Sequence, residues 1–264
     1  MSEKLTDEGR GLGMIKAIMH GCNGRMGHVI VDLASGDDKI EIVAGVDAYG
    51  DNTYSFPVFD SIEKCDVAAD VVIDFSNASA VDNLLEVCAS KNLPVVLCTT
   101  GLSDEQLAKV KSTSEKVAVL KSANMSVGIN MLMKVLKEIS PVLDAAGFDI
   151  EIVEKHHNQK LDAPSGTALA LADSVNDSLS EKCEYVYDRS TRREKRPKKE
   201  IGISAVRGGT IVGDHDVIFA GTDEVITLSH RAYSRSVFAK GAIEAAKFLA
   251  GKDAGLYDMS SVIE

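Results

Sequence analysis

Short apolar runs alternate with helical patterns through the first half of the chain. The runs read as buried strands because each is brief and most end at a polar turn; they cover residues 14–20, 41–46, 70–75, 94–98 and 117–121. Helical patterns follow the first, third and fourth runs, over residues 28–35, 78–90 and 104–116. Strands and helices that alternate in this way predict a parallel, doubly wound sheet, whose ligands lie beyond the carboxyl ends of the strands.

The second half of the chain has a different pattern. Residues 149–155 alternate polar and apolar positions, as a half-buried strand does. Strand-like stretches follow at 201–206, 215–220 and 224–229, with helical patterns at 168–179 and 236–250. These patterns predict an α+β domain with an open, mixed and mostly antiparallel sheet over 127–236. The dinucleotide-type domain then comprises 14–126 and 237–264, and the polar residues 1–13 are expected to form a disordered extension.

A glycine-rich turn joins the first predicted strand to the first helix. Gly21, Gly24 and Gly27 are spaced Gly-x-x-Gly-x-x-Gly, so the turn departs from the usual Gly-x-Gly-x-x-Gly. Glycines allow the backbone to turn tightly and to approach a pyrophosphate that lies on a helix N-terminus. The alternative is a turn that only connects strand to helix.

An acidic residue ends the second predicted strand. Asp47 follows Gly27 by 20 residues, where a carboxylate accepts hydrogen bonds from the adenosine ribose of a dinucleotide. Ala48 and Tyr49 come next, with no Lys or Arg, so NADH is favoured over NADPH; Arg25 and Lys16 remain alternative partners of a 2′-phosphate. The polar turns at 98–101 and 122–125 are the candidates for the nicotinamide end.

The segment 156–167 concentrates the chemistry of the second half. His156, His157 and Lys160 fall within five residues, just before the Pro-Ser-Gly-Thr entry to a helix. Free amides and hydroxyls at that entry, with proton donors beside them, suit a carboxylate receptor. Three alternatives stand beside this interpretation: a metal bound by the paired histidines, a nucleophilic Ser165, and an exposed loop before an ordinary capped helix.

Composition narrows the function classes. The net charge is −11 over 264 residues, which disfavours nucleic acid and anionic lipid as partners. The five cysteines include no Cys-x-x-Cys pair, so neither a disulfide framework nor a metal site is predicted. The sequence has no membrane-length apolar run and no secretory signal, which predicts a cytoplasmic protein. Seven basic residues within 188–200 indicate a solvated loop or a surface that attracts a dianionic ligand.

From Met14 onward the chain resembles the 4-hydroxy-tetrahydrodipicolinate reductase (dihydrodipicolinate reductase) family. The resemblance rests on the HH-x-x-K-x-DAPSGTA stretch, supported by Gly21–Gly27, Thr99–Gly101, NMSVGIN at 124–130, IVGDH at 211–215 and the tail GLYDM. It implies an NAD(P)H-dependent oxidoreductase of diaminopimelate and lysine biosynthesis. In such an enzyme, hydride adds to ring carbon C4 of a cyclic dicarboxylate and the 4-hydroxyl leaves as water. It also implies an N-terminal Rossmann-type domain and a substrate-binding and oligomerisation domain over 127–236 that builds a homotetramer.

The resemblance also implies residue roles. His156 and Lys160 would transfer protons. The substrate carboxylates would be held by His157, Ser165, Gly166 and Thr167. The cofactor would be contacted by Gly21, Cys22, Asn23, Gly24, Arg25, Met26, Asp47, Cys98, Thr99, Thr100, Ser122, Ala123, Asn124 and Met125. Two positions depart from the family pattern, since Cys98 stands where glycine is frequent and Ala48 where some members carry an arginine for NADPH.

Two rival functions predict different behaviour. An amino-acid dehydrogenase running in the oxidative direction needs no DAPSGTA carboxylate receptor and would reduce NAD when given an amino acid. A nucleotide-sensing protein would bind NADH but leave it unconsumed. The presence of both His156 and Lys160 favours an enzyme, because a sensor has no need of positioned acids.

Overall fold

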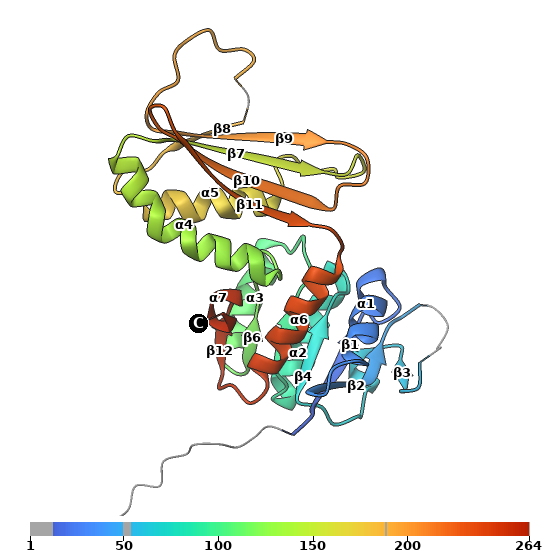
Figure 1. Ribbon diagram of the computed structural model, residues 1–264. Helices are drawn as coiled ribbons and strands as arrows, with labels where there is room; N and C mark the ends of the chain where they lie inside the picture. The colour runs from blue at the N-terminus through green and yellow to red at the C-terminus, as the bar shows by residue number, and fades with distance from the viewer. Residues whose placement is uncertain (1–12, 50–53, 188, 264) are drawn as a thin grey trace, which may run out of the picture. The chain divides into compact units, whose positions relative to one another are not determined.

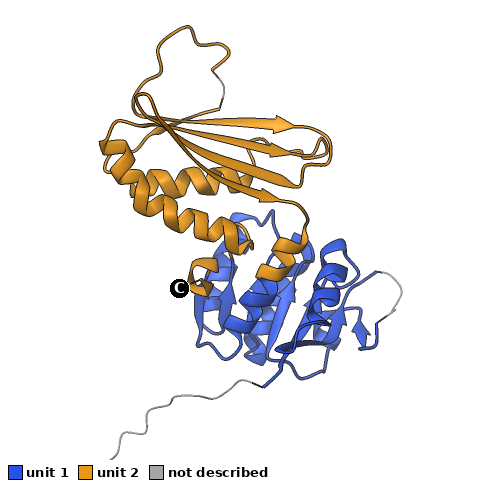
Figure 2. Cartoon of the chain, in the orientation of Figure 1, with its two compact units in different colours: residues 1–121, 242–257 blue, residues 122–241, 258–264 orange. Residues whose placement is uncertain are grey.

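The chain forms two compact units in a computed structural model that describes residues 13–49, 54–187 and 189–263. Unit 1 comprises Met1–Lys121 and Ala242–Tyr257, and unit 2 comprises Ser122–Gly241 and Asp258–Glu264 (Figure 2). The boundaries expected from the sequence, at 126/127 and 236/237, lie five residues from these divisions. The last segment groups with unit 2 rather than unit 1. The expected extension at 1–13 lies outside the described residues except for Gly13.

Unit 1 contains a seven-stranded sheet in the order β12-β6-β5-β4-β1-β2-β3, in which every pairing is parallel. Its elements in chain order are β1 (Ile15–His20), α1 (Arg25–Ala34), β2 (Ile40–Val46), β3 (Val58–Phe59), η1 (Ile62–Lys64), β4 (Val71–Asp74), α2 (Ala78–Lys91), β5 (Val95–Leu97), α3 (Asp104–Ser114), β6 (Ala118–Leu120), the C-terminal part of α6 (Ser236–Leu249) and β12 (Gly255–Tyr257). The predicted parallel, doubly wound sheet is confirmed.

The order of the strands explains where a ligand would lie. Strand β1 pairs with β2 on one side and β4 on the other, so the chain winds outward from β1 in both directions. Right-handed crossovers then place α1 on one face of the sheet and α2 and α3 on the other. Helices α2 and α3 pack over a core that includes Ile18, Leu84 and Val110. The crevice of such a sheet lies at the carboxyl ends of β1 and β4.

Unit 2 contains a five-stranded mixed sheet in the order β11-β10-β7-β9-β8. Its elements are α4 (Val127–Ala145), β7 (Asp149–His156), α5 (Gly166–Ser178), β8 (Glu184–Val186), β9 (Glu200–Arg207), β10 (Gly213–Ala220), β11 (Val225–Ala232), the first part of α6 and α7 (Met259–Val262). Figure 1 shows α4 and α5 against one face of this sheet, with no helix on the other.

The mixed sheet agrees with the sequence-based expectation. Strand β10 pairs antiparallel with β7 and β11, whereas β9 pairs parallel with β7 and β8. Parallel neighbours need a crossover, and α5 supplies it between β7 and the β8–β9 pair. Strand β7 buries every second residue, so Ile150, Ile152, Glu154 and His156 share the helix-covered face.

Local signals account for the helix starts near the candidate site. Ser126 and Ser165 are the N-caps of α4 and α5, and their hydroxyls accept hydrogen bonds from the amides of Ile129 and Ala168. None of the helices among the described residues combines the length and the hydrophobicity that a membrane crossing requires.

Candidate functional site

The glycine turn of unit 1 has the geometry that close approach to a ligand needs. Gly21 has a φ of +84°, and a Cβ placed on it would lie 2.6 Å from the carbonyl oxygen of Phe75. A Cβ on Gly27 would lie 2.3 Å from the carbonyl oxygen of Gly21, so the first turn of α1 packs directly on the loop. Gly24 caps α1 without a side-chain hydrogen bond. The first amides of the helix are therefore available to an anion.

A cavity of about 350 Å³ opens at the carboxyl ends of β1, β2 and β4. Its described lining includes the cofactor candidates Gly21, Gly24 and Asp47, and no Lys or Arg. The Asp47 carboxylate already accepts hydrogen bonds from two backbone amides, Asn23 N at 3.0 Å and Tyr49 N at 3.0 Å. Asp47 therefore fixes the glycine turn against the end of β2 while its side chain stays half-buried beside the cavity.

A fully buried carboxylate organises the neighbouring strand ends. Asp74 Oδ1 lies 2.7 Å from His20 Nδ1 and accepts from Ser76 Oγ at 2.6 Å, and Asp74 Oδ2 accepts from Thr99 Oγ1 at 2.6 Å. These contacts join the ends of β1, β4 and β5. Among the predicted cofactor residues after β5, Thr99 is therefore buried, whereas Cys98 is half-buried and Thr100 exposed.

The remaining cofactor candidates of the glycine turn differ in burial. The Cys22 side chain is fully buried beneath the turn, where burial, with a smaller effect of Asp47, raises its thiol pKa to about 11. Its backbone is engaged as well, because its amide donates to the Val46 carbonyl and its carbonyl accepts from the Tyr54 hydroxyl. Asn23 and Met26 are half-buried, and Arg25 is exposed at the start of α1.

The turn at 122–125 belongs to unit 2, where two asparagines hold it. Asn130 Nδ2 donates to the carbonyl oxygens of Asn124 and Ser126, both at 2.8 Å. Asn124 Nδ2 in turn donates to Thr167 Oγ1 at 2.9 Å. A predicted cofactor residue is thus bonded directly to a predicted substrate residue. Within the same turn Ser122 is half-buried, Ala123 exposed and Met125 buried.

His156 ends β7 with one ring nitrogen held by a carboxylate. His156 Nδ1 lies 2.6 Å from Oε2 of Glu154, which is completely buried. Burial lowers the pKa of His156 and Glu154 partly offsets that effect. Burial alone would raise the pKa of Glu154, but hydrogen bonds from Arg207, His156 and the Ser165 amide bring it below its ordinary value. The pair therefore contains an ionised glutamate and a histidine inclined to be neutral.

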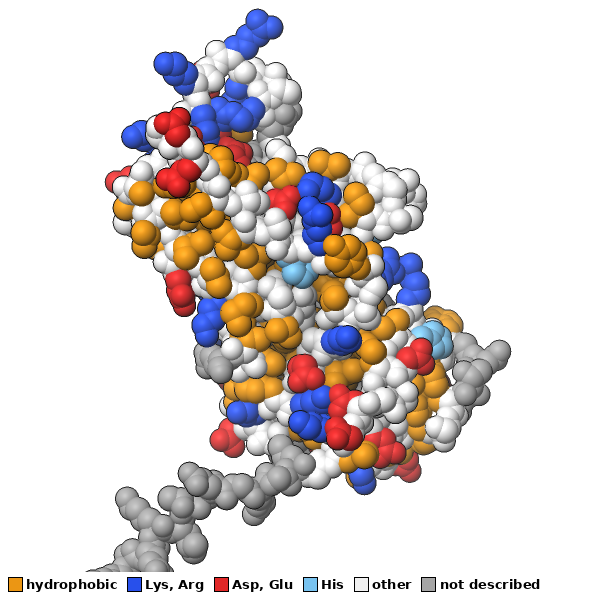
Figure 3. All heavy atoms as spheres, in the orientation of Figure 1, with side chains coloured by type: hydrophobic (Ala, Val, Ile, Leu, Met, Phe, Trp, Pro, Cys, Tyr) orange, Lys and Arg blue, Asp and Glu red, His pale blue; other side chains and the backbone are white. Residues whose placement is uncertain are grey.

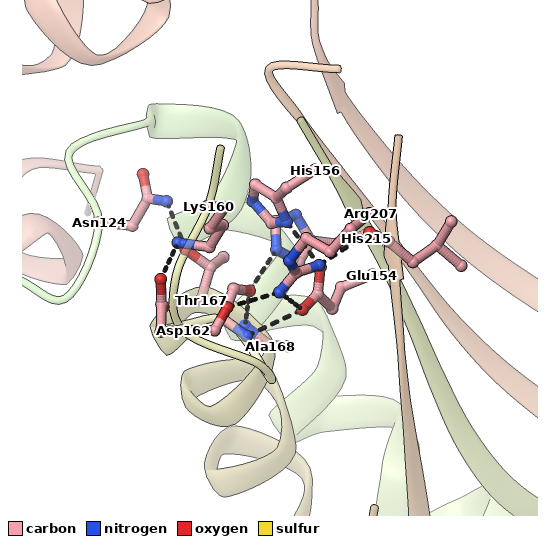
Figure 4. A network of polar contacts seen from close by, with 11 residues as sticks. Asn124, Glu154, His156, Lys160, Asp162, Thr167, Ala168, Arg207 and His215 are labelled. Carbon is pink, nitrogen blue, oxygen red and sulfur yellow. Dashed lines mark hydrogen bonds and ion pairs between the residues drawn. The ribbon is translucent and has the colours of Figure 1, made fainter. Parts of the chain in front are cut away.

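The start of α5 lies against this pair, as the close view in Figure 4 shows. Ser165 N donates to Glu154 Oε1 at 3.0 Å, and Ser165 Oγ lies 3.1 Å from His215 Nε2. Ser165 is 2% exposed, so its hydroxyl serves as the cap of α5 and not as a free nucleophile. By contrast Gly166 is exposed, and nothing lies within 4 Å of the position its Cβ would occupy. The amide end of α5 is open to a ligand at that residue.

Lys160 and His157 occupy the loop between β7 and α5. Lys160 Nζ forms an ion pair with Asp162 Oδ1 at 2.8 Å, and its side chain is 22% exposed. The positive charge of Lys160 contributes to lowering the pKa of His156. His157 is half-buried. The proton-transfer candidates and the substrate-binding candidates are thus gathered around one end of β7 in unit 2.

The paired histidines do not form part of a metal cluster in the structure. Within residues 13–49, 54–187 and 189–263, no group of three His, Cys, Asp or Glu side chains is arranged to hold a metal ion. His156 instead packs edge-on against His215, with ring centroids 5.2 Å apart.

The basic loop before β9 is less solvated than its composition predicts. Arg189 and Arg192 pair with the buried Glu200, and Arg196 pairs with Asp149 and Glu151. The other basic residues, Arg193, Lys195, Lys198 and Lys199, are exposed, and Figure 3 shows basic side chains gathered on this part of unit 2. Three of the seven cations therefore brace the starts of β7 and β9, and Lys199 forms ion pairs with Asp144 and Glu181.

Two family models together cover the described core of the chain. The model described as "Dihydrodipicolinate reductase, N-terminus" matches residues 15–125, and "Dihydrodipicolinate reductase, C-terminus" matches residues 128–263. The chain belongs to the dihydrodipicolinate reductase family.

Relatives of this family are similar over nearly their full length. The 4-hydroxy-tetrahydrodipicolinate reductase of Caldanaerobacter subterraneus subsp. tengcongensis is 55% identical, covering 95% of this chain and 99% of the relative. The enzyme of that name from Clostridium tetani is 52% identical over 95% of this chain and 97% of its own. This likeness confirms the predicted oxidoreductase class.

Solved structures agree with the fold. A dipicolinate-bound dihydrodipicolinate reductase from Paenisporosarcina sp. TG-14 has a TM-score of 0.77 at 26% identity, covering 95% of this chain and 100% of its own. A probable dehydrogenase from Thermotoga maritima, at 12% identity and a TM-score of 0.62, covers 94% of this chain and 92% of its own. The second likeness concerns the fold alone.

Several polar residues of this dihydrodipicolinate reductase family member escaped the sequence analysis. Glu154 had a readable signal, because it lies two residues before His156 and so shares its face of β7. His215 is the last residue of the IVGDH motif, but only the pairing of β7 with β10 places it beside Glu154. Arg207 had no signal, since only the pairing of β7 with β9 brings it to Glu154. Asp74 and His20 meet through the pairing of β1 with β4.

Proposed function

We propose that this enzyme reduces 4-hydroxy-tetrahydrodipicolinate to tetrahydrodipicolinate in diaminopimelate and lysine biosynthesis. The substrate, NAD(P)H and a proton give the product, NAD(P)⁺ and water. The names of relatives 55% and 52% identical to the chain support this reaction. The observation that carries the proposal is the open amide end of α5 at Gly166, built onto the same buried carboxylate as the proton donor His156.

The residues of unit 1 fit a nicotinamide dinucleotide. The glycine turn and the uncapped start of α1 suit a pyrophosphate, and Asp47 is available at the cavity for ribose hydroxyls. When bound, the nicotinamide supplies the hydride that adds to C4 of the substrate ring. NADH is favoured because the described lining of the cavity offers Asp47 but no cation for a 2′-phosphate.

The substrate is held by its two carboxylates. Gly166 and Thr167 offer amides at the start of α5, and Thr167 also offers a hydroxyl that Asn124 orients. Lys160 adds local positive charge in a chain whose net charge is −11, and His157 adds ring nitrogens that can hydrogen-bond a carboxylate. The dipicolinate-bound relative supports a planar ring dicarboxylate as the ligand class.

Protons are supplied from the loop between β7 and α5. Reduction of a conjugated imine leaves an electron-rich enamine, which a cationic acid must protonate. Lys160 donates this proton, and its ion pair with Asp162 keeps the ammonium near the receptor until substrate binds. His156 donates or accepts a proton through Nε2, since Glu154 occupies Nδ1.

The enzyme acts in the cytoplasm as a homotetramer that associates through unit 2. The helix-free face of the mixed sheet supports this prediction (Figure 1). Side chains on that face include Val206 and Val225, which are 45% and 62% exposed, and apolar surface of this kind suits a subunit interface. Sedimentation velocity of the purified enzyme would measure the assembly.

The reaction is tested by supplying freshly prepared substrate and following nicotinamide absorbance with NADH and with NADPH in parallel. We expect consumption of both and a higher kcat/KM with NADH. If the protein binds NADH but consumes neither cofactor, it is a binding protein and the proposal is wrong. Oxidation of an amino acid with NAD would identify the dehydrogenase alternative.

A further inference from the structure

The buried carboxylate of Glu154 is not explained by a contribution to stability. Glu154 is 0% exposed, and burying an ion pair often costs more free energy than the pair returns. Apolar residues of similar volume frequently serve a fold as well as a buried ion pair does. A fully buried glutamate next to a proton-transfer residue therefore points to a role in the reaction.

Each oxygen of this carboxylate holds a different part of the site. Oε2 accepts the hydrogen bond from His156 Nδ1 at 2.6 Å, and Oε1 accepts from Ser165 N, at the N-cap of α5, at 3.0 Å. A single rigid group therefore connects the proton-transfer residue to the carboxylate receptor (Figure 4).

Arg207 fixes that group from the neighbouring strand. Its two terminal nitrogens donate to the two oxygens of Glu154, Nη1 to Oε2 at 2.8 Å and Nη2 to Oε1 at 2.7 Å. Nη2 also donates to the carbonyl oxygen of Asp162 at 2.6 Å, two residues after Lys160. Such a two-pronged contact prevents rotation of the carboxylate about its last bond.

We propose that Glu154 and Arg207 are positioning residues for the reduction: they hold His156 with its proton on Nδ1 and its Nε2 free, and they set the α5 amides at a fixed distance from that nitrogen. The inference rests on the proposed function. Neither residue needs to touch the substrate. Nε2 has room because β10 carries glycine opposite it; a Cβ on Gly213 would lie 3.1 Å from that atom.

The charges around His156 give the proposal a measurable consequence. Glu154 raises the pKa of His156 against the lowering effects of burial, Lys160 and Arg207. The imidazole of His215 packs against the ring, and Asp162 neutralises part of the Lys160 charge. Removing the Glu154 charge therefore moves the pKa of His156 further down, and with it the limb of the kcat–pH profile that depends on His156.

Glu154→Gln tests this arrangement because glutamine has one acceptor oxygen and one NH2. If that oxygen keeps the hydrogen bond from the Ser165 amide, the NH2 faces His156 Nδ1. Nδ1 must then accept a hydrogen bond, so the ring proton moves to Nε2. If the oxygen keeps His156, the NH2 faces the Ser165 amide. In each orientation one of the two contacts is lost. We therefore expect kcat to fall roughly 30- to 100-fold and the substrate KM to rise several-fold. The His156 limb, identified as the one that His156→Ala removes, should move to lower pH, while the Kd for NADH changes less than about twofold.

Glu200→Gln is the matched control. Glu200 is also a buried carboxylate of unit 2 and is 2% exposed, but its ion pairs are with Arg189 and Arg192 of the basic loop. We expect it to lower the unfolding midpoint without moving the pH profile or the substrate KM. If Glu200→Gln reduces kcat as much as Glu154→Gln, the effect is one of general stability and the inference is wrong.

The outcomes separate the inference from the function on which it rests. If the wild-type enzyme does not turn over, the proposed function fails first. If the wild type is active and folded Glu154→Gln keeps its kcat, KM and pH profile, only the positioning role fails. Should Glu154→Gln not fold, Arg207→Lys replaces it, because an ammonium keeps the charge but cannot bridge both oxygens. That variant should lose roughly tenfold in kcat, and unchanged kinetics would overturn the proposal.

Discussion

Each unit of the enzyme contains a buried carboxylate–histidine pair, and the two pairs are nearly identical in isolation. His20 Nδ1 lies 2.7 Å from Asp74 Oδ1, with side-chain exposures of 9% and 0%. His156 Nδ1 lies 2.6 Å from Glu154 Oε2, with exposures of 10% and 0%. Distance and burial therefore do not distinguish them.

The surroundings of the two carboxylates differ. The further donors to Asp74 are uncharged groups of Ser76 and Thr99, which come from the ends of strands. Glu154 is bound by the guanidinium of Arg207 and by the first amide of the α5 cap. The first carboxylate ties loops together beneath the cofactor cavity, whereas the second is kept ionised beside a histidine that can gain a proton. The other donors to the carboxylate of a buried pair therefore determine whether the pair serves structure or proton transfer.

The largest expected effect separates proton transfer from cofactor binding. Lys160→Ala removes the proposed donor to the enamine, so turnover should fall by a factor on the order of 100 or more, equivalent to about 2.7 kcal/mol of activation free energy. NADH affinity, measured by fluorescence titration, should be nearly unchanged. Lys155→Ala is the control, because Lys155 pairs with Asp216 on the other face of β7. Near-normal turnover of Lys160→Ala would remove Lys160 from the mechanism.

A somewhat smaller effect is expected at the other pair. Asp74→Ala leaves the buried donors of His20 and Thr99 and the half-buried hydroxyl of Ser76 without an acceptor, so the free energy of unfolding should fall by about 2 kcal/mol. Urea denaturation measures this loss, and NADH binding should weaken with it. Asp70→Ala at the opposite end of β4 is the control, since Asp70 is exposed and accepts a hydrogen bond from the amide of Lys16. If Asp74→Ala shifts the kcat–pH profile as Glu154→Gln does, the proposed difference between the two pairs is wrong.

The two pairs also mark how far the sequence could predict the structure. The glycine turn and the α5 entry were predictable because their residues are adjacent in the chain. Arg207 lies 53 residues from Glu154 and meets it only through the register of β9 with β7. Strands β3, β8 and β12 have only two or three residues. Strands β5 and β6 are as short as β8 and β12 but are entirely apolar, which made them predictable, whereas β8 contains Glu184 and β12 begins with Gly255. Helix α4 was not assigned, although Ser126 caps it, and it continues through Pro141.

A third prediction concerns the histidine that packs against His156. Burial, followed by the charge of His156, lowers the pKa of His215 to about 4. The unfolded chain binds a proton at this residue near pH 6.5, so below that pH it binds more protons than the native state, and stability falls as the pH drops from about 6.5 towards 4. Between pH 7.5 and 5.5 this residue should cost about 1 kcal/mol. His215→Asn should remove that part of the pH dependence in urea titrations; an unchanged slope would show that His215 titrates normally.

The smallest expected effect tests the cofactor end of unit 1. Asp47→Ala removes the acceptor for ribose hydroxyls, so the Kd for NADH should rise roughly fivefold, or about 1 kcal/mol. The same change also frees the amides of Asn23 and Tyr49, which affects both cofactors alike. The informative quantity is therefore the ratio of the rise in Kd for NADH to the rise in Kd for NADPH. The Kd for NADPH should rise less than about twofold, because the carboxylate that is removed repels a 2′-phosphate. Asp66→Ala, exposed and outside the cavity lining, controls for net charge. Equal losses for NADH and NADPH would mean that Asp47 only braces the glycine turn, as Asp74 braces the strand ends, and does not read the ribose.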